Sequence, residues 1–222
     1  MEKQLSDIEK IRHSASHILA QAITRLYKNV QLGIGPSIDD GFYYDFNNLK
    51  INEADFEKIE AEMKKIIKAN YEFKKLKKTR KEAEHLLKNQ PYKLELLKDL
   101  DDDNIIFYED GDFIDLCAGP HVKHTSDVKV IKLLKVAGAY WKGSEKNDML
   151  LRIYGSAFCN QKELDDFLKL KEEAEKRDHR KLGKELELFF FNDISPGAPF
   201  WQPKGMIIFK ELEKYWREIH DN

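Results

Sequence analysis

Apolar residues recur at helical spacing near the start of the chain. Ser6 and Glu9 form a Ser-x-x-Glu pattern that is typical of a helix N-terminus, so we predict a helix from there to about Tyr27. At ~100° per residue, seven apolar positions share one side of this helix and are expected to face the core. They are Ile8, Ile11, Ala15, Ile18, Leu19, Ala22 and Leu26.

The opposite side of the same helix is unusual. It carries His13, His17, Ala20 and Thr24, whereas a helix face in bulk water normally carries Lys and Glu. This narrow, neutral sector predicts that the two histidines face a cleft.

Strand and helix patterns alternate over the next stretch. Residues 30–46 predict two strands around a turn at Asp39–Asp40–Gly41. A short strand is predicted at 71–77. Three helices are also predicted: 53–69 after a cap at Asn52, 80–87 after a second capping box at Thr79, and 91–100 with proline in the first turn.

Strand patterns dominate after residue 103. NIIFYE and DFIDLC flank Asp110–Gly111, which predicts a hairpin, and further strands are predicted at 129–134, 136–141 and 149–154. A long polar helix follows from Gln161 to about Leu186, then a proline- and glycine-rich loop. The last helix is expected to turn Ile208, Leu212, Tyr215 and Trp216 inward. The fold class predicted is α+β, with mainly antiparallel sheets packed with helices.

Composition limits the classes of function. The 222 residues include 38 Lys and Arg against 40 Asp and Glu, so a uniformly basic nucleic-acid binder is excluded. The local basic stretch from Lys64 to Lys81 is interpreted as solvated surface, with an RNA-phosphate track as the alternative. Two cysteines, no apolar run of about 20 residues and no hydrophobic leader predict a cytoplasmic protein without membrane contact.

Two pairs of chemically capable residues stand out, each spaced four apart. His13 and His17 lie on the first helix, and Cys117 and His121 lie about one hundred residues later in DLCAGPH. The Gly-Pro between the second pair excludes a regular helix, and Asp115 shares a strand face with Cys117. If the fold unites these pairs, the His3Cys set can hold zinc or position a water for hydrolysis.

The remaining histidines and Cys159 are interpreted as surface, packing or structural residues. The histidines are His85, His124, His179 and His220.

Several long motifs, in order, resemble bacterial threonyl-tRNA synthetase. They are RHSASHILAQAI, IGPSIDDGFYYDF, PYKLELL, DLCAGPH, KVAGAYWKGSEKNDMLLRIYGSAF and KRDHRKLGKELELF. The resemblance covers nearly the whole chain, so it is far more specific than any single HxxxH pair.

The resemblance implies a domain map. Residues 1–158 would be the editing domain, residues 159–186 a linker helix, and residues 187–222 the opening of a truncated class II catalytic domain. The family's small N-terminal domain and its ATP, magnesium and zinc sites would lie outside this chain. This fragment is therefore not expected to attach threonine to tRNA, and the homodimer of the full-length family would form through the absent domain.

The resemblance also implies a site and a substrate. The substrate would be the acceptor end of tRNA(Thr) wrongly charged with serine, hydrolysed by water without a required metal. Tyr44 would be a further pocket residue. The catalytic set that matches the family is His13, His17, Lys93, Asp115, Cys117 and His121.

The resemblance suggests individual roles for these residues. Asp115 would bind the amine, and Lys93 would orient water or stabilise the oxyanion. Alanine at His13 or Lys93 is expected to abolish deacylation while leaving the fold intact.

Two other functions stay open at this point. One is a non-catalytic RNA-binding module whose His/Cys cluster holds structural zinc. The other is a metal-dependent hydrolase of small esters. Cleavage, rather than mere binding, of mischarged tRNA would separate the first from editing. Faster hydrolysis of the ester when the tRNA body is attached would separate the second, the small-ester hydrolase, from editing.

Overall fold

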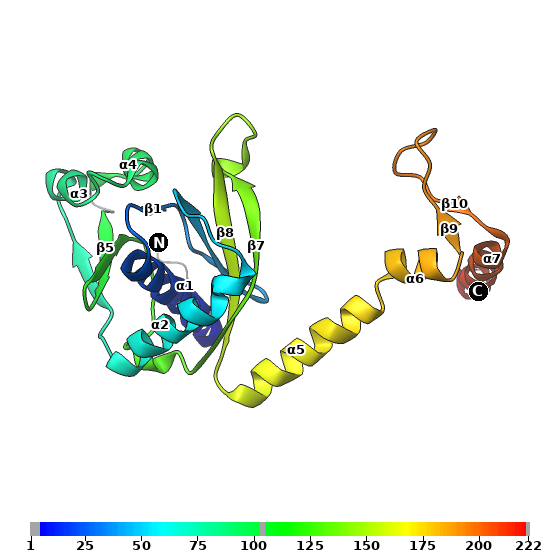
Figure 1. Ribbon diagram of the computed structural model, residues 1–222, viewed down its shortest axis with the longest axis horizontal. Coiled ribbons are helices and arrows are strands. Elements are labelled where there is room, and N and C mark those ends of the chain that lie inside the picture. The colour runs from blue at the N-terminus through cyan, green and yellow to red at the C-terminus, as the bar shows by residue number, and fades with distance from the viewer. Residues whose placement is uncertain (1–4, 103–104, 221–222) are drawn as a thin grey trace. The chain divides into compact units, whose positions relative to one another are not determined.

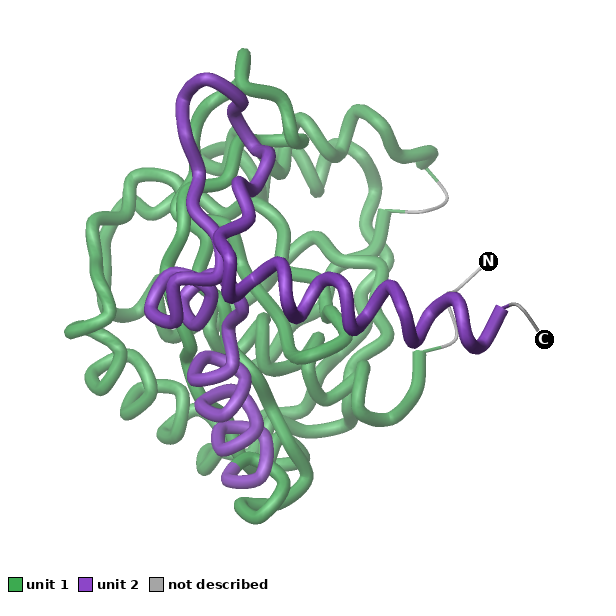
Figure 2. The backbone as a smooth tube through the Cα atoms, turned by 90° about the vertical axis from the view of Figure 1, so that its right-hand side faces the viewer, with its two compact units in different colours: residues 1–164 green, residues 165–222 purple. Residues whose placement is uncertain are grey.

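The computed structural model describes residues 5–102 and 105–220. The chain forms two compact units, residues 1–164 and residues 165–222 (Figure 2). Asn104, which begins the first strand of the predicted hairpin, lies outside the described residues. The α+β fold class is confirmed by a mixture of helices and antiparallel sheets.

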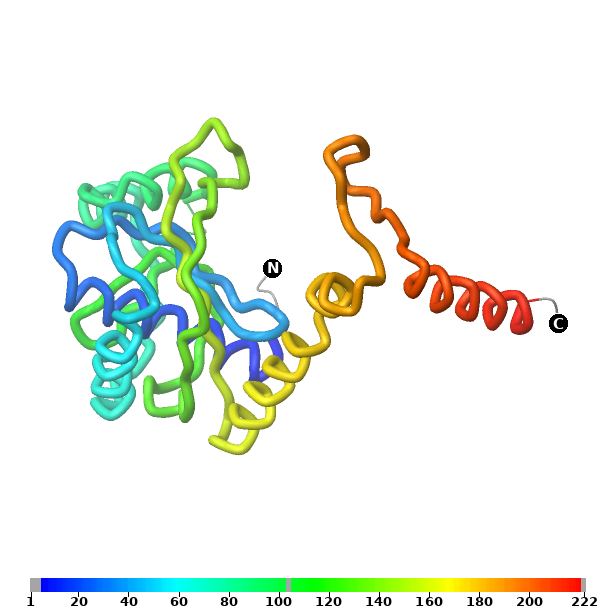
Figure 3. Tube along the Cα trace, turned by 45° about the vertical axis from the view of Figure 1, so that its right-hand side comes forward, coloured from blue at the N-terminus to red at the C-terminus, as the bar shows by residue number. Residues whose placement is uncertain are grey.

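Unit 1 is built on a five-stranded antiparallel sheet (Figure 1). The strand order is β1-β3-β8-β7, and β2 pairs with the other end of β3. The long β7–β8 hairpin is also visible in Figure 3. The strands are β1 (Gln31–Leu32), β2 (Ser37–Ile38), β3 (Gly41–Asn47), β7 (Val130–Tyr140) and β8 (Met149–Phe158), with the turn η4 (Trp141–Gly143) between the last two.

Helices α1 (Asp7–Leu26) and α2 (Phe56–Ala69) pack against each other and against this sheet (Figure 1). The predicted capping box of α1 is present, since the Ser6 hydroxyl accepts from the backbone of Glu9. A 3-10 turn, η1 (Glu53–Asp55), precedes α2 and is capped by Asn52. All ten residues from Ser14 to Ile23 are buried, so α1 runs through the core of unit 1.

A second, three-stranded sheet has the order β4-β5-β6. The predicted hairpin is confirmed, with Asp110 opposite Phe113. Two short helices pack on this sheet through Ala83, Leu87 and Leu97. The elements are β4 (Lys74–Lys77), α3 (Arg80–Leu86), α4 (Pro91–Lys98), β5 (Ile106–Asp110), β6 (Phe113–Leu116) and the 3-10 turn η3 (Thr125–Asp127) that leads to β7.

Two sequence predictions about chain breaks are wrong. The strands expected at 129–134 and 136–141 form one strand, β7, because a register shift between Leu133 and Lys135 absorbs the irregularity without ending the pairing with β8. The helix expected from Gln161 to Leu186 is two helices, α5 (Gln161–Lys176) and α6 (His179–Glu185). Asp178 ends the regular pattern because its side chain caps the second helix at the backbone of Arg180.

Unit 2 contains most of α5, then α6, a small hairpin and a final helix. The hairpin pairs β9 (Phe189–Phe190) with β10 (Phe200–Trp201), and the latter lies inside the segment predicted as a loop. Helix α7 (Pro203–His220) exposes the residues that were expected to face inward, including Leu212 at 63% and Trp216 at 58%. That expectation is wrong, because no described residue covers them. Among the described residues, no helix combines the length and apolarity needed to cross a membrane.

One buried carboxylate lies at the end of β5. The Asp110 side chain is fully buried, and neither of its oxygens has a hydrogen-bond partner among the described residues. Burial, with a smaller contribution from Asp112, raises the pKa of Asp110 to about 8. The neighbouring Asp112 differs, since hydrogen bonds from Arg25 and Gln21 favour its charged form and lower its pKa.

These two carboxylates predict opposite pH effects. Because the pKa of Asp110 is raised in the folded state, the protonated carboxyl stabilises the fold. This contribution to the free energy of unfolding is full below pH ~4 and is lost as the pH rises to about 8. The gain in free energy of unfolding of Asp110→Asn over the parent is therefore expected to be larger at pH 8.5 than at pH 5, by a few kcal/mol. Asp112→Asn, the matched control, is expected to lower the free energy of unfolding slightly at pH 8.5. Urea unfolding at both pH values measures this, and an Asp110→Asn effect independent of pH would contradict it.

Candidate active site

The two predicted residue pairs meet in unit 1. His13 and His17 lie on α1, and Cys117 and His121 lie on the segment that follows β6. One ligand-capable atom from each of the four lies within 4.8 Å of the others. The His121 ring lies 4.2 Å from those of His13 and His17, centroid to centroid.

Hydrogen bonds fix how α1 meets that segment. The Nδ1 atom of His13 lies 3.1 Å from the carbonyl oxygen of Pro120, and the Ser14 hydroxyl accepts from the backbone N–H of Val122 at 3.0 Å. The same hydroxyl lies 3.1 Å from Nδ1 of His121. The Cys117 sulfur lies 3.2 Å from His13 Nε2 and 3.6 Å from His121 Nε2.

These contacts favour one arrangement of protons. A carbonyl oxygen only accepts, so His13 carries its proton on Nδ1 and offers a lone pair at Nε2. The Ser14 hydroxyl already accepts from Val122, and His121 Nδ1 is the acceptor that its own hydrogen can reach. His121 then carries its proton on Nε2, facing the Cys117 sulfur. The thiol in turn donates to His13 Nε2, which gives a chain of bonds with one direction.

A buried ion pair forms the next part of the site. Lys93, on α4, is 3% exposed, and its ammonium lies 2.7 Å from one carboxylate oxygen of Asp115 and 2.8 Å from the other. The Tyr44 hydroxyl donates to Asp115 at 2.5 Å, and His17 Nε2 lies 4.0 Å from the same carboxylate. Sequence reasoning treats a lysine on a short helix as solvated, so Lys93 was predicted only through the family resemblance.

A cavity of about 320 Å³ opens beside these groups, at the small end of the range for ligand pockets. Polar groups line it together with apolar residues such as Ile34, Leu96 and Leu116. His121 and Tyr44 do not line this cavity but contact residues that do, Cys117 and Asp115 respectively. The site residues that line it are His13, His17, Lys93, Asp115 and Cys117.

Burial keeps the imidazoles and the thiol neutral. It lowers the pKa of His13, and it lowers the pKa of His17 and His121 well below the usual value, with the neighbouring rings adding to the effect. Burial also raises the pKa of the Cys117 thiol to about 12. Neutral imidazoles can accept a proton or bind a metal, so the site is compatible with either chemistry.

Two contacts in the cluster have the spacing of zinc ligands. Tetrahedral zinc separates nitrogen and sulfur ligands by about 3.4–3.6 Å, close to the observed contacts of Cys117 with His13 and His121. The outer nitrogens of both rings are hydrogen-bonded, as in metal-binding histidines. The buried Nδ1 of His17 has no hydrogen-bond partner among the described residues. The residues present therefore fit a zinc ion.

Two further residues of the candidate site were not predicted from the sequence. Ser14 lies between the two histidines of the first pair, and only its position in RHSASH could have suggested a role. Gly35 lines the cavity. Its backbone lies so close to Tyr44 that a Cβ there would be 2.1 Å from the Tyr44 ring. The cysteine predicted to be structural, Cys159, is exposed.

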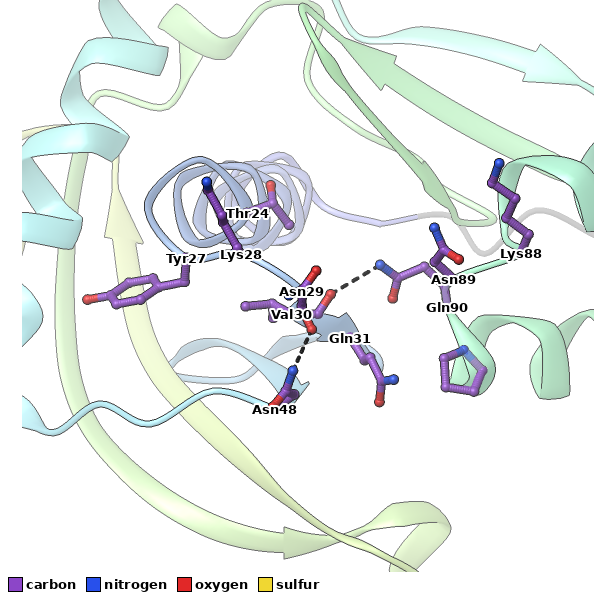
Figure 4. A pocket seen from close by; sticks show the side chains of 11 residues that line it. Thr24, Tyr27, Lys28, Asn29, Val30, Gln31, Asn48, Lys88, Asn89 and Gln90 are labelled. Carbon is purple, nitrogen blue, oxygen red and sulfur yellow. Dashed lines mark hydrogen bonds between the residues drawn. The ribbon is translucent and has the colours of Figure 1, made fainter.

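A larger cavity of about 790 Å³ lies elsewhere in unit 1 (Figure 4). It holds none of the predicted site residues and is lined mainly by amide and lysine side chains. Size alone would therefore have pointed away from the His/Cys cluster.

Comparison with known proteins places part of this chain in a family. Residues 105–154 match the family described as "Threonyl and Alanyl tRNA synthetase second additional domain". This segment includes Asp115, Cys117 and His121, so unit 1 contains a domain of the threonyl-tRNA synthetase editing family.

Particular relatives narrow the identification. The chain is 56% identical over 215 residues to the threonine–tRNA ligase of Clostridium acetobutylicum, 57% over 217 residues to that of Clostridium novyi and 53% over 217 residues to that of Thermotoga petrophila. The matches cover 95–96% of this chain and 34% of each relative, so the chain spans about a third of their length. The chain is a homologue of the threonine–tRNA ligases, which confirms the family resemblance.

The proton arrangement predicts an effect of Ser14→Ala. Removing the hydroxyl takes away the donor to His121 Nδ1, so the preference of His121 for a proton on Nε2 should weaken. Long-range ¹H–¹⁵N NMR spectra report the tautomer. The matched control is Ser16→Ala, because the Ser16 hydroxyl donates to backbone oxygens of His13 and Gly35 and not to a ring. A proton on Nδ1 of His121 in the parent would contradict the assignment.

The ion pair changes the expectation for Lys93. Lys93→Ala leaves the Asp115 carboxylate buried without its cation, so it should lower the free energy of unfolding by about 3–5 kcal/mol rather than leave the fold intact. The double variant Lys93→Met/Asp115→Asn removes both charges and should lose less. Urea unfolding compares them, with the exposed Lys98→Ala as control. Equal stability of Lys93→Ala and Lys98→Ala would refute the role of the pair.

Proposed function

We propose that unit 1 hydrolyses the ester between serine and the 3′-terminal adenosine of tRNA(Thr). The observation that carries this proposal is the meeting of a neutral imidazole, a fixed ammonium and a thiol at one cavity. The match to the synthetase editing family supports the substrate class. Activity of the whole ligase, its use of ATP, its homodimer and its cytoplasmic location stay predictions.

In this proposal His13 handles the proton. Its Nδ1 is bound to Pro120, so Nε2 is its accepting atom; the attacking water takes the place of the Cys117 thiol as donor to Nε2 and gives up its proton there. The water oxygen bonds to the ester carbon, the bond to the ribose oxygen breaks, and the proton passes to that oxygen. The products are serine and a free 3′ hydroxyl.

Lys93 is assigned the developing negative charge on the carbonyl oxygen. An ammonium held by Asp115 and by the Leu116 carbonyl needs little reorganisation when that charge forms. Asp115 is 1% exposed and already bound by Lys93 and Tyr44, so we assign it to positioning Lys93 rather than to binding the amine. Tyr44 and His121 are likewise assigned to positioning, because Tyr44 bonds Asp115 and His121 contacts Cys117.

A separate hydrolytic site explains how serine and threonine are separated. They differ by one methyl group, which changes binding by only about 1–3 kcal/mol. A small cavity that accepts serine and crowds the extra methyl adds a second selection step. The 320 Å³ cavity with Ile34, Leu96 and Leu116 in its wall is suited to that task.

The second candidate function is a non-catalytic RNA-binding module with structural zinc. It is favoured by the close ligand-capable atoms of the His3Cys cluster. Zinc would be held by His13, His17, Cys117 and His121, and in a catalytic variant it would supply a polarised water. Full deacylation after exhaustive chelation would support the metal-free reaction. Stoichiometric zinc whose removal stops hydrolysis would reverse this choice.

The proposal predicts selective deacylation by this chain. Seryl-tRNA(Thr) should be hydrolysed and threonyl-tRNA(Thr) spared, and His13→Ala should lower the rate constant by about 10²–10⁴. Because the pKa of His13 is lowered, the parent's rate should increase with rising pH only below pH ~6.5. Above that pH, where His13 is neutral, the rate should stay constant.

Radiolabelled deacylation assays measure both effects. The matched control is His85→Ala, an exposed histidine on α3 that should behave as the parent does. Undiminished hydrolysis by His13→Ala would refute the role of His13, and hydrolysis of both esters at equal rates would refute selection.

A further inference from the structure

The cavity of about 790 Å³ in unit 1 is a polar groove at the C-terminal end of α1 (Figure 4). It lies between that helix end, the start of β1 and the α3–α4 connection. The described residues that line it carry no carboxylate, although the chain as a whole is slightly acidic. They include Lys28, Lys88, Asn29, Gln31, Asn48, Asn89 and Gln90. We call this feature the amide groove.

Some of these amides maintain the groove itself. Gln90 bonds the backbone at β1 and at the residue before it, because the Leu32 N–H donates to its side-chain oxygen and its amide donates to the Val30 carbonyl. The Asn48 amide donates to the carbonyl of Asn29. These bonds hold the three walls together, as the dashed lines in Figure 4 partly show.

Other polar groups of the amide groove are available to a ligand. Lys28 and Lys88 are exposed, stand on opposite sides of the groove and have no ion-pair or hydrogen-bond partner among the described residues (Figure 4). The side chains of Asn29 and Asn89 are likewise exposed and unpaired among those residues. Two cations and neutral carboxamides without acids fit a polyanion that also offers hydroxyl and base-edge partners. Single-stranded RNA has this chemistry.

Neighbouring stretches of the chain line the amide groove and the candidate site. The segment at Val30 and Gln31 lines the groove, and a few residues later Ile34 to Pro36 line the site cavity. The α3–α4 connection lines the groove, and Lys93 of α4 lines the site. On α1, Thr24 of the groove lies roughly 16 Å along the axis from His13. A chain whose end enters the site can therefore reach the groove.

We propose that the amide groove binds the ribose–phosphate backbone of the nucleotides that precede the esterified 3′ end of the RNA. The inference rests on the proposed function and adds a second contact area for its substrate. Lys28 and Lys88 each contact phosphate, and the carboxamides contact ribose hydroxyls or base edges. The lysine cluster on α2 and β7 is a weaker candidate, because Glu60 puts a carboxylate among its lining residues and pairs with Lys132.

Paired lysine variants of the 222-residue chain test this proposal. Lys28→Ala/Lys88→Ala changes the groove, and Lys64→Ala/Lys68→Ala on α2 is the matched control, with two equally exposed lysines. The substrates are 3′-seryl-adenosine, which is too short to reach the groove, and seryl-tRNA(Thr). All four side chains are at the surface, so both variants should fold, and circular dichroism checks this.

The groove variant should raise KM for seryl-tRNA(Thr) by about tenfold, with kcat unchanged and hydrolysis of seryl-adenosine unaffected. The slope of log affinity against log salt should fall by roughly 1.4, as expected for two lost phosphate contacts with a single strand. The α2 variant should match the parent. Parental values in the groove variant, or the loss appearing in the α2 variant instead, would overturn the proposal.

Failure of the proposed function can be told apart from failure of this inference. If the parent hydrolyses neither ester, fluorescence anisotropy with labelled tRNA(Thr) still measures binding. Weaker binding by the groove variant alone would then support the amide groove without the editing reaction. Equal binding by parent and groove variant would overturn it.

Discussion

Two hydrogen bonds join the middle of α1 to the segment that follows β6, one from His13 to Pro120 and one from Val122 to Ser14. They tie together parts of the chain that are about one hundred residues apart. Ser14 is fully buried, so losing its partner would leave polar groups unsatisfied in the core. This constraint holds the two residue pairs in register, and the cavity lies beside the junction. The otherwise buried course of α1 supplies the rigidity that such a site needs.

The Lys93–Asp115 pair is the second constraint and explains why a highly charged chain buries two charges here. A buried ion pair gives little net stability, because desolvation offsets much of the attraction. Its value lies in placing an ammonium at the cavity wall with almost no freedom to move. Tyr44 and the close approach of Gly35 fix the other side of that carboxylate. The pair therefore serves the site by fixing a charge more than by adding net stability.

Much of the fold follows from local sequence rules. Capping boxes at Ser6 and Thr79 marked two helix starts, and turn residues marked the β5–β6 hairpin. The errors lie where tertiary pairing or a single side chain decides. β7 continues through its irregularity because β8 pairs with it on both sides, and Asp178 divides the helix expected to be continuous.

The site could be predicted only in part. Four of its side chains were recognisable as residue types that bind metals or carry protons. Lys93 and Ser14 are ordinary in sequence and gain their roles from burial, which no local pattern reports. The apolar side of α7 shows the reverse case: its helical periodicity predicts burial, but the described residues leave Leu212 and Trp216 exposed.

The most direct test of the central claim is a crystal structure of this chain with a seryl-adenosine analogue whose ester is replaced by an amide. The account predicts the seryl group in the cavity, with its carbonyl oxygen near the Lys93 ammonium and its carbonyl carbon facing His13. An analogue bound in another cavity, or bound with His13 and Cys117 far apart, would contradict it.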